Sequence, residues 1–225
     1  NEITQWADTD GDGYGDNQAG VTPDDCIAVV GTSTGDRYGC PDSDTDSFSD
    51  PDVLWTVALG ADACETVAGT SSQDRNGCPD DDSDGYSDPD PTGTNGPVWL
   101  VTDGADAFTG DSTQWVDTDG DGYGDNPPPA TLGDSCPAVS GTSSQDRLGC
   151  TDSDGDGYSD PDATWTAALN GADAFPSDVT QWADADGDGY GDNSSGNDAD
   201  DCPTISGTSS ELGRLGCTDT DGDGY

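Results

Sequence analysis

The sequence predicts an elongated tandem-repeat array of loops with little regular secondary structure and few short strands or helical turns. Only 29% of the 225 residues are apolar and the formal net charge is −45, a composition that cannot fold by burying apolar surface. A nine-residue pattern of aspartates recurs seven times, and eight cysteines form four pairs at nearly constant spacing. Local loops and local crosslinks are therefore expected to take the place of a large core.

The acidic pattern is clearest at residues 152–160, which read DSDGDGYSD. Carboxylates stand at relative positions 1, 3, 5 and 9, a glycine stands at position 6, and an aromatic residue at position 7 can direct its backbone carbonyl inward. Ca²⁺ takes about six to eight oxygen ligands, and a short loop supplies them only if alternate side chains and a carbonyl converge. The spacing therefore predicts loops that bind Ca²⁺.

The loops come in two versions, each with its own flanking sequence. A loops follow Thr-Gln-Trp, and B loops end in Ser-Asp-Pro-Asp. The predicted calcium ligands of the A loops are Asp8, Asp10, Asp12, Tyr14, Asp16; Asp117, Asp119, Asp121, Tyr123, Asp125; and Asp184, Asp186, Asp188, Tyr190, Asp192. Those of the B loops are Asp42, Asp44, Asp46, Phe48, Asp50; Asp80, Asp82, Asp84, Tyr86, Asp88; and Asp152, Asp154, Asp156, Tyr158, Asp160. A seventh copy supplies Asp219, Asp221 and Asp223 and stops at Tyr225, before its ninth position.

The cysteines fall into four local pairs. These are Cys26 with Cys40, Cys64 with Cys78, Cys136 with Cys150, and Cys202 with Cys217. Zinc fits poorly because the chain has no C-x-x-C and no histidine. Disulfides fit better, each with about 3 kcal/mol of stabilisation for a loop of this length, and they predict an extracellular or cell-surface protein. Reduced structural thiols are the alternative.

The repeats divide the chain into four predicted units. Residues 1–52 hold an A loop, a disulfide segment and a B loop; residues 53–90 form a shortened unit with a B loop only; residues 91–162 form the third unit; and residues 163–225 form the fourth, whose last loop is truncated. In such arrays each unit contacts only its neighbours. Single helical turns are expected near residues 165–169.

Tryptophan and arginine recur at fixed places between the loops. Trp55, Trp99 and Trp165 follow B loops, and Trp6, Trp115 and Trp182 precede A loops. They are expected to form small cores, with stacking on carbohydrate as the alternative. All four arginines stand three residues before the second cysteine of a pair, where a clamp to a carboxylate or carbonyl is expected.

The D-x-D-x-D-G-x-x-D loops alternate with segments such as DSCP at 134–137 and GCTD at 149–152. In this the chain resembles the thrombospondin type 3 repeats, and most closely their long microbial versions. The resemblance covers essentially the whole chain, and it implies extracellular modules wrapped around calcium ions and fastened by disulfides. An EF-hand fits less well, because the glutamate at position 12 and the flanking helices are missing.

This chain departs from the family pattern in two ways. No loop has an acid at position 12; the B loops place Asp52, Asp90 and Asp162 at position 11, and Ser47 stands where a glycine is expected. Further candidate ligands are Asp25, Asp134 and Asp201 beside the cysteines, and Asp62, Asp106 and Asp173 in Gly-Ala-Asp-Ala segments.

The composition also limits the partners. Four arginines and no lysine argue against nucleic acid and anionic lipid, and no apolar run approaches the roughly 18 residues of a membrane span. Without histidine, lysine or a unique constellation of reactive groups, an enzyme is not expected. Asn193 begins the sequon Asn-Ser-Ser, for which chance occurrence and glycosylation both stay open.

Two functions remain. The first is an extracellular calcium-binding structural protein, a stiff stalk or a segment of a fibre or filament, whose partners are other copies of itself head to tail or further repeats of the same chain. The alternative is a calcium-dependent adhesin or spacer that presents a recognition domain elsewhere. Binding of glycans or matrix by the repeats themselves would favour the alternative.

Overall fold

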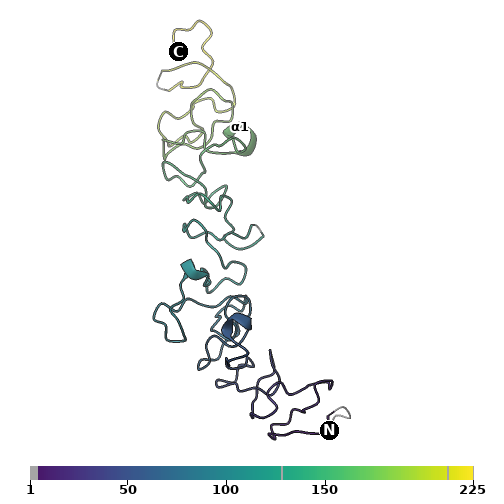
Figure 1. Cartoon of the computed structure of the whole chain (residues 1–225). Coiled ribbons are helices and arrows are strands. Elements are labelled where there is room, and N and C mark those ends of the chain that lie inside the picture. The colour runs from purple at the N-terminus through teal and green to yellow at the C-terminus, as the bar shows by residue number, and fades with distance from the viewer. Residues whose placement is uncertain (1–4, 128, 212, 225) are drawn as a thin grey trace. The chain divides into compact units, whose positions relative to one another are not determined.

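The computed structural model describes residues 5–127, 129–211 and 213–224 (Figure 1). Helical structure in these ranges is limited to two 3-10 turns, η1 (Val57–Leu59) and η2 (Val101–Asp103), and one short α-helix, α1 (Ala167–Asn170). The same ranges contain isolated β-bridges but no extended strand. The expectation of little regular secondary structure is confirmed, and α1 lies where a helical turn was expected.

Each helical turn ends at a glycine in the left-handed region. Gly60, Gly104 and Gly171 have φ values of +115°, +113° and +83°. Glycine adopts such angles without the steric cost that a Cβ brings. The chain can therefore leave the helix after three or four residues and enter the Ala-Asp-Ala segment that follows.

Four disulfides hold the chain locally, in the predicted pairing. The Cα–Cα distances are 5.0 Å for Cys26–Cys40 and 5.1 Å for Cys64–Cys78, Cys136–Cys150 and Cys202–Cys217, with sequence separations of 14 or 15. The described residues include no free cysteine. Disulfides of this kind indicate a secreted or extracellular protein.

The chain forms two compact units, Asn1–Val116 and Asp117–Tyr225. Among the described residues of the two units, the buried apolar ones are cysteines, alanines and Leu215, while buried aspartates, serines and glutamines are more numerous. One apolar cluster joins Ala63 to the disulfide Cys64–Cys78. No helix in the described ranges is long and apolar enough to span a membrane. Polar groups therefore fill most of the interior.

Candidate metal centres

The first aspartate of each loop shapes the turn. In loop 152–160, Asp152 accepts the N–H groups of Gly155 and Gly157 with its two oxygens, at 2.8 and 3.0 Å. Both glycines have positive φ, +83° and +97°. All seven loops repeat this pair of bonds, with distances between 2.7 and 3.2 Å. The backbone thus curls around the carboxylate at position 1.

In loop 152–160, the aspartates at positions 3 and 5 each have one oxygen without a hydrogen-bond donor in the described residues. Asp154 accepts the N–H of Asp156 at 3.2 Å, and Asp156 accepts the N–H of Tyr158 at 2.9 Å, in both cases through Oδ1. Oδ2 of each residue is buried and has no hydrogen-bond donor within the described part of the chain. A buried carboxylate oxygen without a donor is costly unless a cation neutralises it.

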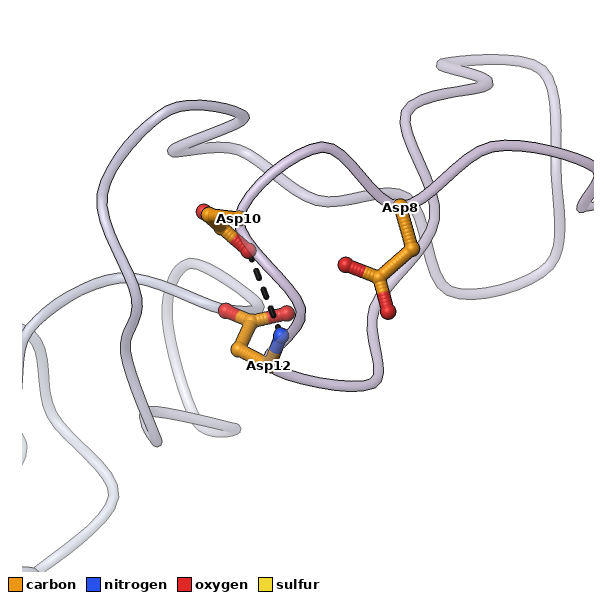
Figure 2. A group of neighbouring side chains, drawn as sticks. All are labelled: Asp8, Asp10 and Asp12. Atoms are coloured by element: carbon orange, nitrogen blue, oxygen red, sulfur yellow. Dashed lines mark hydrogen bonds between the residues drawn. The ribbon is translucent and has the colours of Figure 1, made fainter.

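The carboxylates at positions 1, 3 and 5 come together. In at least five loops, oxygens of all three residues lie within 4.8 Å of one another, as in Asp8, Asp10 and Asp12. Figure 2 shows Asp10 and Asp12 close together, joined by the hydrogen bond from the Asp12 N–H to Asp10, with the carboxylate of Asp8 facing them across the loop. Several aspartate triplets could therefore hold a metal ion.

Positions 7 and 9 complete the loop in different ways. In the described loops, the carbonyls of Tyr14, Phe48, Tyr86, Tyr123, Tyr158 and Tyr190 accept no main-chain hydrogen bond, which leaves them available to a ligand. The aspartate at position 9 instead closes the loop on position 2: Asp160 accepts the N–H of Ser153 at 3.0 Å and its hydroxyl at 2.5 Å. Asp160 thus fixes the two ends of the loop together, and the role of the position-9 aspartates as calcium ligands stays a prediction.

A buried aspartate from the following segment covers each of the six loops from 8–16 to 184–192. Asp173 donates its N–H to the carbonyl of Ser159 at 2.9 Å and accepts the N–H of Phe175 at 2.7 Å. Asp173 is 1% exposed, and its Oδ2 has no partner among the described residues. The residues that make these two main-chain contacts are Asp24, Asp62, Asp106, Asp134, Asp173 and Asp200, which we call the covering aspartates.

Burial and neighbouring carboxylates disfavour the ionised form of three covering aspartates, Asp62, Asp106 and Asp173. The pKa of Asp62 is raised to about 7, chiefly by burial and also by the negative charges of Asp46, Asp44 and Asp50, against the lowering effect of the bond from the Cys64 N–H. The pKa values of Asp106 and Asp173 are raised to about 6 by the same causes. A cation among these carboxylates would favour their ionised form.

The disulfide segments close four loops from the other side. Gly69 donates its N–H to Oδ2 of Asp46 at 3.1 Å, and Gly31, Gly141 and Gly207 donate in the same way to Asp12, Asp121 and Asp188. Gly77 lies so close that a Cβ there would be 2.4 Å from Oδ1 of Asp62 and 2.9 Å from Oδ2 of Asp46. Glycines thus let the backbone approach the carboxylates.

Two candidate ligands beside cysteines are corrected by one residue. The sequence pointed to Asp25 and Asp201, but both are exposed and accept N–H groups from Tyr38 and Leu215. Asp24 and Asp200 are buried against the loops instead. The covering aspartate lies two residues before the cysteine in Asp-Ala-Cys and Asp-Ser-Cys, and alignment on the cysteine could have identified Asp24 and Asp200.

Two aspartates at position 11 bind arginine. Arg37 forms an ion pair with Asp52 at 2.8 Å and lies 5.9 Å from the centre of the Trp55 ring. Arg147 makes the equivalent ion pair with Asp162 at 2.8 Å. The bond from Arg37 lowers the pKa of Asp52 to about 2. These aspartates serve the expected arginine clamps and lie outside the triplets.

The third position-11 aspartate is bound by its own turn. Asp90 accepts the N–H groups of Thr94 and Asn95 at 3.2 and 2.7 Å, and chiefly the latter bond lowers its pKa to about 2. Arg75 donates instead to the carbonyl of Asn95 at 3.2 Å and lies 5.4 Å from the Trp99 ring. An inserted turn therefore replaces the ion pair here.

The sequon asparagine is engaged in the fold. Nδ2 of Asn193 donates to the carbonyl of Thr180 at 2.8 Å, and its Oδ1 accepts the N–H of Ser195 at 3.2 Å. A glycan on Nδ2 would have to be accommodated beside Thr180. Chance occurrence and glycosylation of the sequon both stay open.

Comparison with protein-family models and with curated proteins finds no match for this chain. The ligand atoms of the sites indicate which metals the sites suit. These ligand atoms are carboxylate and carbonyl oxygens, without histidine or free thiol in the described residues. Such a set suits hard cations such as Ca²⁺, Mg²⁺ or Mn²⁺, and does not suit zinc held by nitrogen and sulfur. The sites are candidate hard-cation sites.

Proposed function

We propose that this chain is an extracellular or cell-surface calcium-binding structural protein, similar to thrombospondin type 3 repeats, that forms a stiff stalk or a fibre segment. The observation that carries the proposal is the set of buried carboxylate oxygens without a hydrogen-bond donor. They belong to Asp10, Asp24, Asp44, Asp62, Asp82, Asp84, Asp119, Asp134, Asp154, Asp156, Asp173, Asp186, Asp192 and Asp200.

Calcium is favoured over magnesium by the number and arrangement of the oxygens. Each of the six loops from 8–16 to 184–192 offers three triplet carboxylates, a carbonyl at position 7 that accepts no main-chain hydrogen bond, and a covering aspartate nearby, on a backbone made largely of turns. Ca²⁺ accepts six to eight oxygens in flexible geometry, whereas Mg²⁺ requires a near-octahedral set and retains several waters. We therefore assign Ca²⁺ as the cofactor.

Calcium would supply the stability that the small apolar core cannot. Extracellular calcium modules have dissociation constants of about 0.1 to 1 mM, so millimolar calcium contributes about 0.4 to 1.4 kcal/mol per site. Seven such loops together would contribute an amount comparable to the stability of a whole domain. Metal binding and folding would then be one process.

The hydrogen bonds of the disulfide segments support the stalk. Segment 64–78 bonds backward to Asp46 through Gly69, and forward to Gly85, whose carbonyl accepts the N–H groups of Ser72 and Gln73 at 2.8 and 2.9 Å. A segment that contacts the loop on each side is the unit from which a one-dimensional array is built. Further repeats of the chain, or other copies placed head to tail, would extend the array. We propose no enzymatic role.

The first test removes calcium from the oxidised protein. Circular dichroism, small-angle X-ray scattering and electron microscopy would be recorded before EGTA, after EGTA and after readdition of calcium. We expect an ordered rod with calcium, an expanded chain without it, and full recovery. The proposal would be refuted if EGTA changes neither the spectra nor the dimensions of the protein and elemental analysis finds no calcium.

A further inference from the structure

Loops 152–160 and 184–192 are joined without a disulfide. The disulfides of this unit, Cys136–Cys150 and Cys202–Cys217, lie in the other segments between loops. The two loops must therefore be connected by non-covalent contacts of segment 161–183. Two consecutive residues of that segment, Gln181 and Trp182, make contacts in opposite directions.

Trp182 contacts the preceding loop. Its ring stacks on Tyr158, the position-7 residue of loop 152–160, with ring centres 5.3 Å apart and an angle of 4° between the planes. Its carbonyl accepts the N–H of Ala174 at 3.0 Å, next to the covering aspartate Asp173. Trp182 thus contacts the residue that carries the proposed carbonyl ligand and the residue that follows the covering aspartate.

Gln181 contacts the following loop. Its Oε1 accepts the N–H of Asn193 at 3.0 Å, and its Nε2 donates to the carbonyls of Asn193 and Asn197 at 3.1 and 2.8 Å. The side chain is 1% exposed, and a Cβ on Gly191 would be 2.1 Å from Oε1. Ala183 accepts the N–H of Asp192 at 2.9 Å. Residues 181 and 183 therefore hold the end of loop 184–192.

We infer that Gln181 and Trp182 are positioning residues that couple cation binding in loop 152–160 to cation binding in loop 184–192. The inference rests on the proposed calcium-binding function. An ion in the first loop fixes the carbonyl of Tyr158 and its ring, and the ring fixes Trp182. Because Gln181 and Ala183 are its direct neighbours, the second loop is ordered before its own ion arrives.

The coupling is entropic in origin. The conformational entropy of ordering segment 161–183 is lost once for two ions, so the second ion binds more tightly than the first. The effect is reciprocal, because each ion must raise the affinity for the other by the same factor. A segment closed by a disulfide is already restricted before ions bind, so this junction should couple its two loops more strongly than a junction that contains a disulfide does.

The same dipeptide near the start of the chain provides a control. Gln5 holds loop 8–16 in the same way: Oε1 accepts the N–H of Asn17 at 3.2 Å, and Nε2 donates to the carbonyl of Thr22 at 3.2 Å. Trp6 is 78% exposed, and the structure gives it no ring partner in the described residues. Trp6 therefore has the sequence context of Trp182 without its stack.

The test is a calcium titration of the full chain labelled with ¹⁵N. The amides of Gly157 and Gly189 donate to Asp152 and Asp184 at 3.0 and 2.9 Å, so each reports on one loop. Asp154→Asn with Asp156→Asn disables loop 152–160. We expect these substitutions to raise the calcium midpoint at Gly189 by about fivefold or more, a typical size for coupling between sites.

Removing the stack should remove the coupling. With Trp182→Ala the same loop substitutions should change the midpoint at Gly189 by less than about twofold, and with Trp6→Ala the full change should remain. Tyr158→Ala removes the ring but keeps the backbone carbonyl, and it provides a second measurement should Trp182→Ala fail to order.

The outcomes separate the inference from the proposed function. Two outcomes with calcium responses at both amides would overturn the inference alone. In the first, the substitutions in loop 152–160 leave the calcium midpoint at Gly189 unchanged. In the second, they still change that midpoint in Trp182→Ala and Tyr158→Ala. No calcium response at either amide would overturn the inference and the proposed function together.

Discussion

Loop 42–50 carries non-glycine residues at both backbone positions that adopt positive φ. Thr45 and Ser47 have φ values of +68° and +92°, whereas loop 152–160 has glycines there. A side chain in this region costs on the order of 1 kcal/mol. Ser47→Gly should therefore tighten calcium binding by loop 42–50 about fivefold, measured by the calcium midpoint of the Thr45 amide.

The control for Ser47→Gly is Ser140→Gly. Ser140 is exposed and is not among the residues with positive φ, so a glycine there only loosens the unfolded chain and costs a few tenths of a kcal/mol or more. If Ser47→Gly binds calcium in loop 42–50 no more tightly than the native chain does, backbone strain at Ser47 does not weaken calcium binding by this loop.

The neighbours Asp24 and Asp25 allow a matched comparison of a covering and an exposed carboxylate. Asp24 is 0% exposed with Oδ2 unpartnered in the described chain, while Asp25 is exposed. Asp24→Asn keeps an acceptor for the Cys26 N–H but removes the charge, so calcium binding by loop 8–16 should weaken on the order of tenfold. Asp25→Asn should leave it nearly unchanged. The readout is the calcium midpoint of the Gly13 amide, and equal effects would remove Asp24 from the ligand set.

Spacing within a loop could predict the triplets but not the covering aspartates. Positions 1, 3 and 5 meet because their turns are local, and spacing alone describes a local turn. Asp24 and Asp25 carry the same carboxylate, and the pattern within the loop does not separate them; the distance of two residues from Asp24 to Cys26 does, and the main-chain bond from Asp24 to Gly15 accompanies its burial. Likewise, no spacing rule shows that Asp52 binds Arg37.

Among the elements, the disulfide segments carry the contacts between neighbouring loops. Segment 64–78 bonds to loop 42–50 through Gly69 and to loop 80–88 through Ser72. Cys64→Ser with Cys78→Ser should cost about 3 kcal/mol for a loop of this length. We expect this loss to appear as higher calcium midpoints in both flanking loops, measured at Thr45 and Gly85.

The loops of the other unit are the internal reference for this variant. Loops 117–125 and 152–160 should keep their midpoints, because an array transmits stability mainly between neighbours. A uniform shift over all loops would instead indicate that the chain folds as one cooperative body. An unchanged midpoint at Thr45 and Gly85 would mean that the crosslink has no part in forming the sites.

The sequence could predict which cysteines pair within a disulfide segment, but not which aromatic rings stack between one segment and another. Cysteines 14 or 15 residues apart in a polar chain have few other partners, so the disulfides followed from spacing. The stacking of Trp115 on Tyr86 and of Trp182 on Tyr158 joins residues 29 and 24 positions apart through irregular segments. Periodicity gives no information about such contacts, and the elongated array remains a prediction for the same reason.

For the whole molecule, charge decides how the ion-free chain responds to pH. The raised pKa values belong to buried carboxyls, about 7 for Asp62 and about 6 for Asp106 and Asp173, against an ordinary value of 3.8. At pH values between 3.8 and these raised pKa values, the folded chain binds more protons than the unfolded chain. The free energy of unfolding of the ion-free chain therefore falls as pH rises through this range. Asp52, with its pKa lowered to about 2, stays ionised in this range and adds no pH dependence.

The calcium-free protein should therefore become more ordered as pH falls from 8 to 5, which is the reverse of ordinary acid denaturation. With calcium present the trend should change sign, because protons compete with the ions for the same carboxylates. Near-UV circular dichroism and hydrodynamic radius, recorded at pH 5, 6, 7 and 8 with and without calcium, measure both trends. Asp62→Asn removes the group with the highest pKa, so at pH 8 its calcium-free form should be more compact than the native chain. If order in the absence of calcium instead rises with pH, the buried carboxylates are neutralised by something other than protons or metal ions, and the cation sites lose their main electrostatic support.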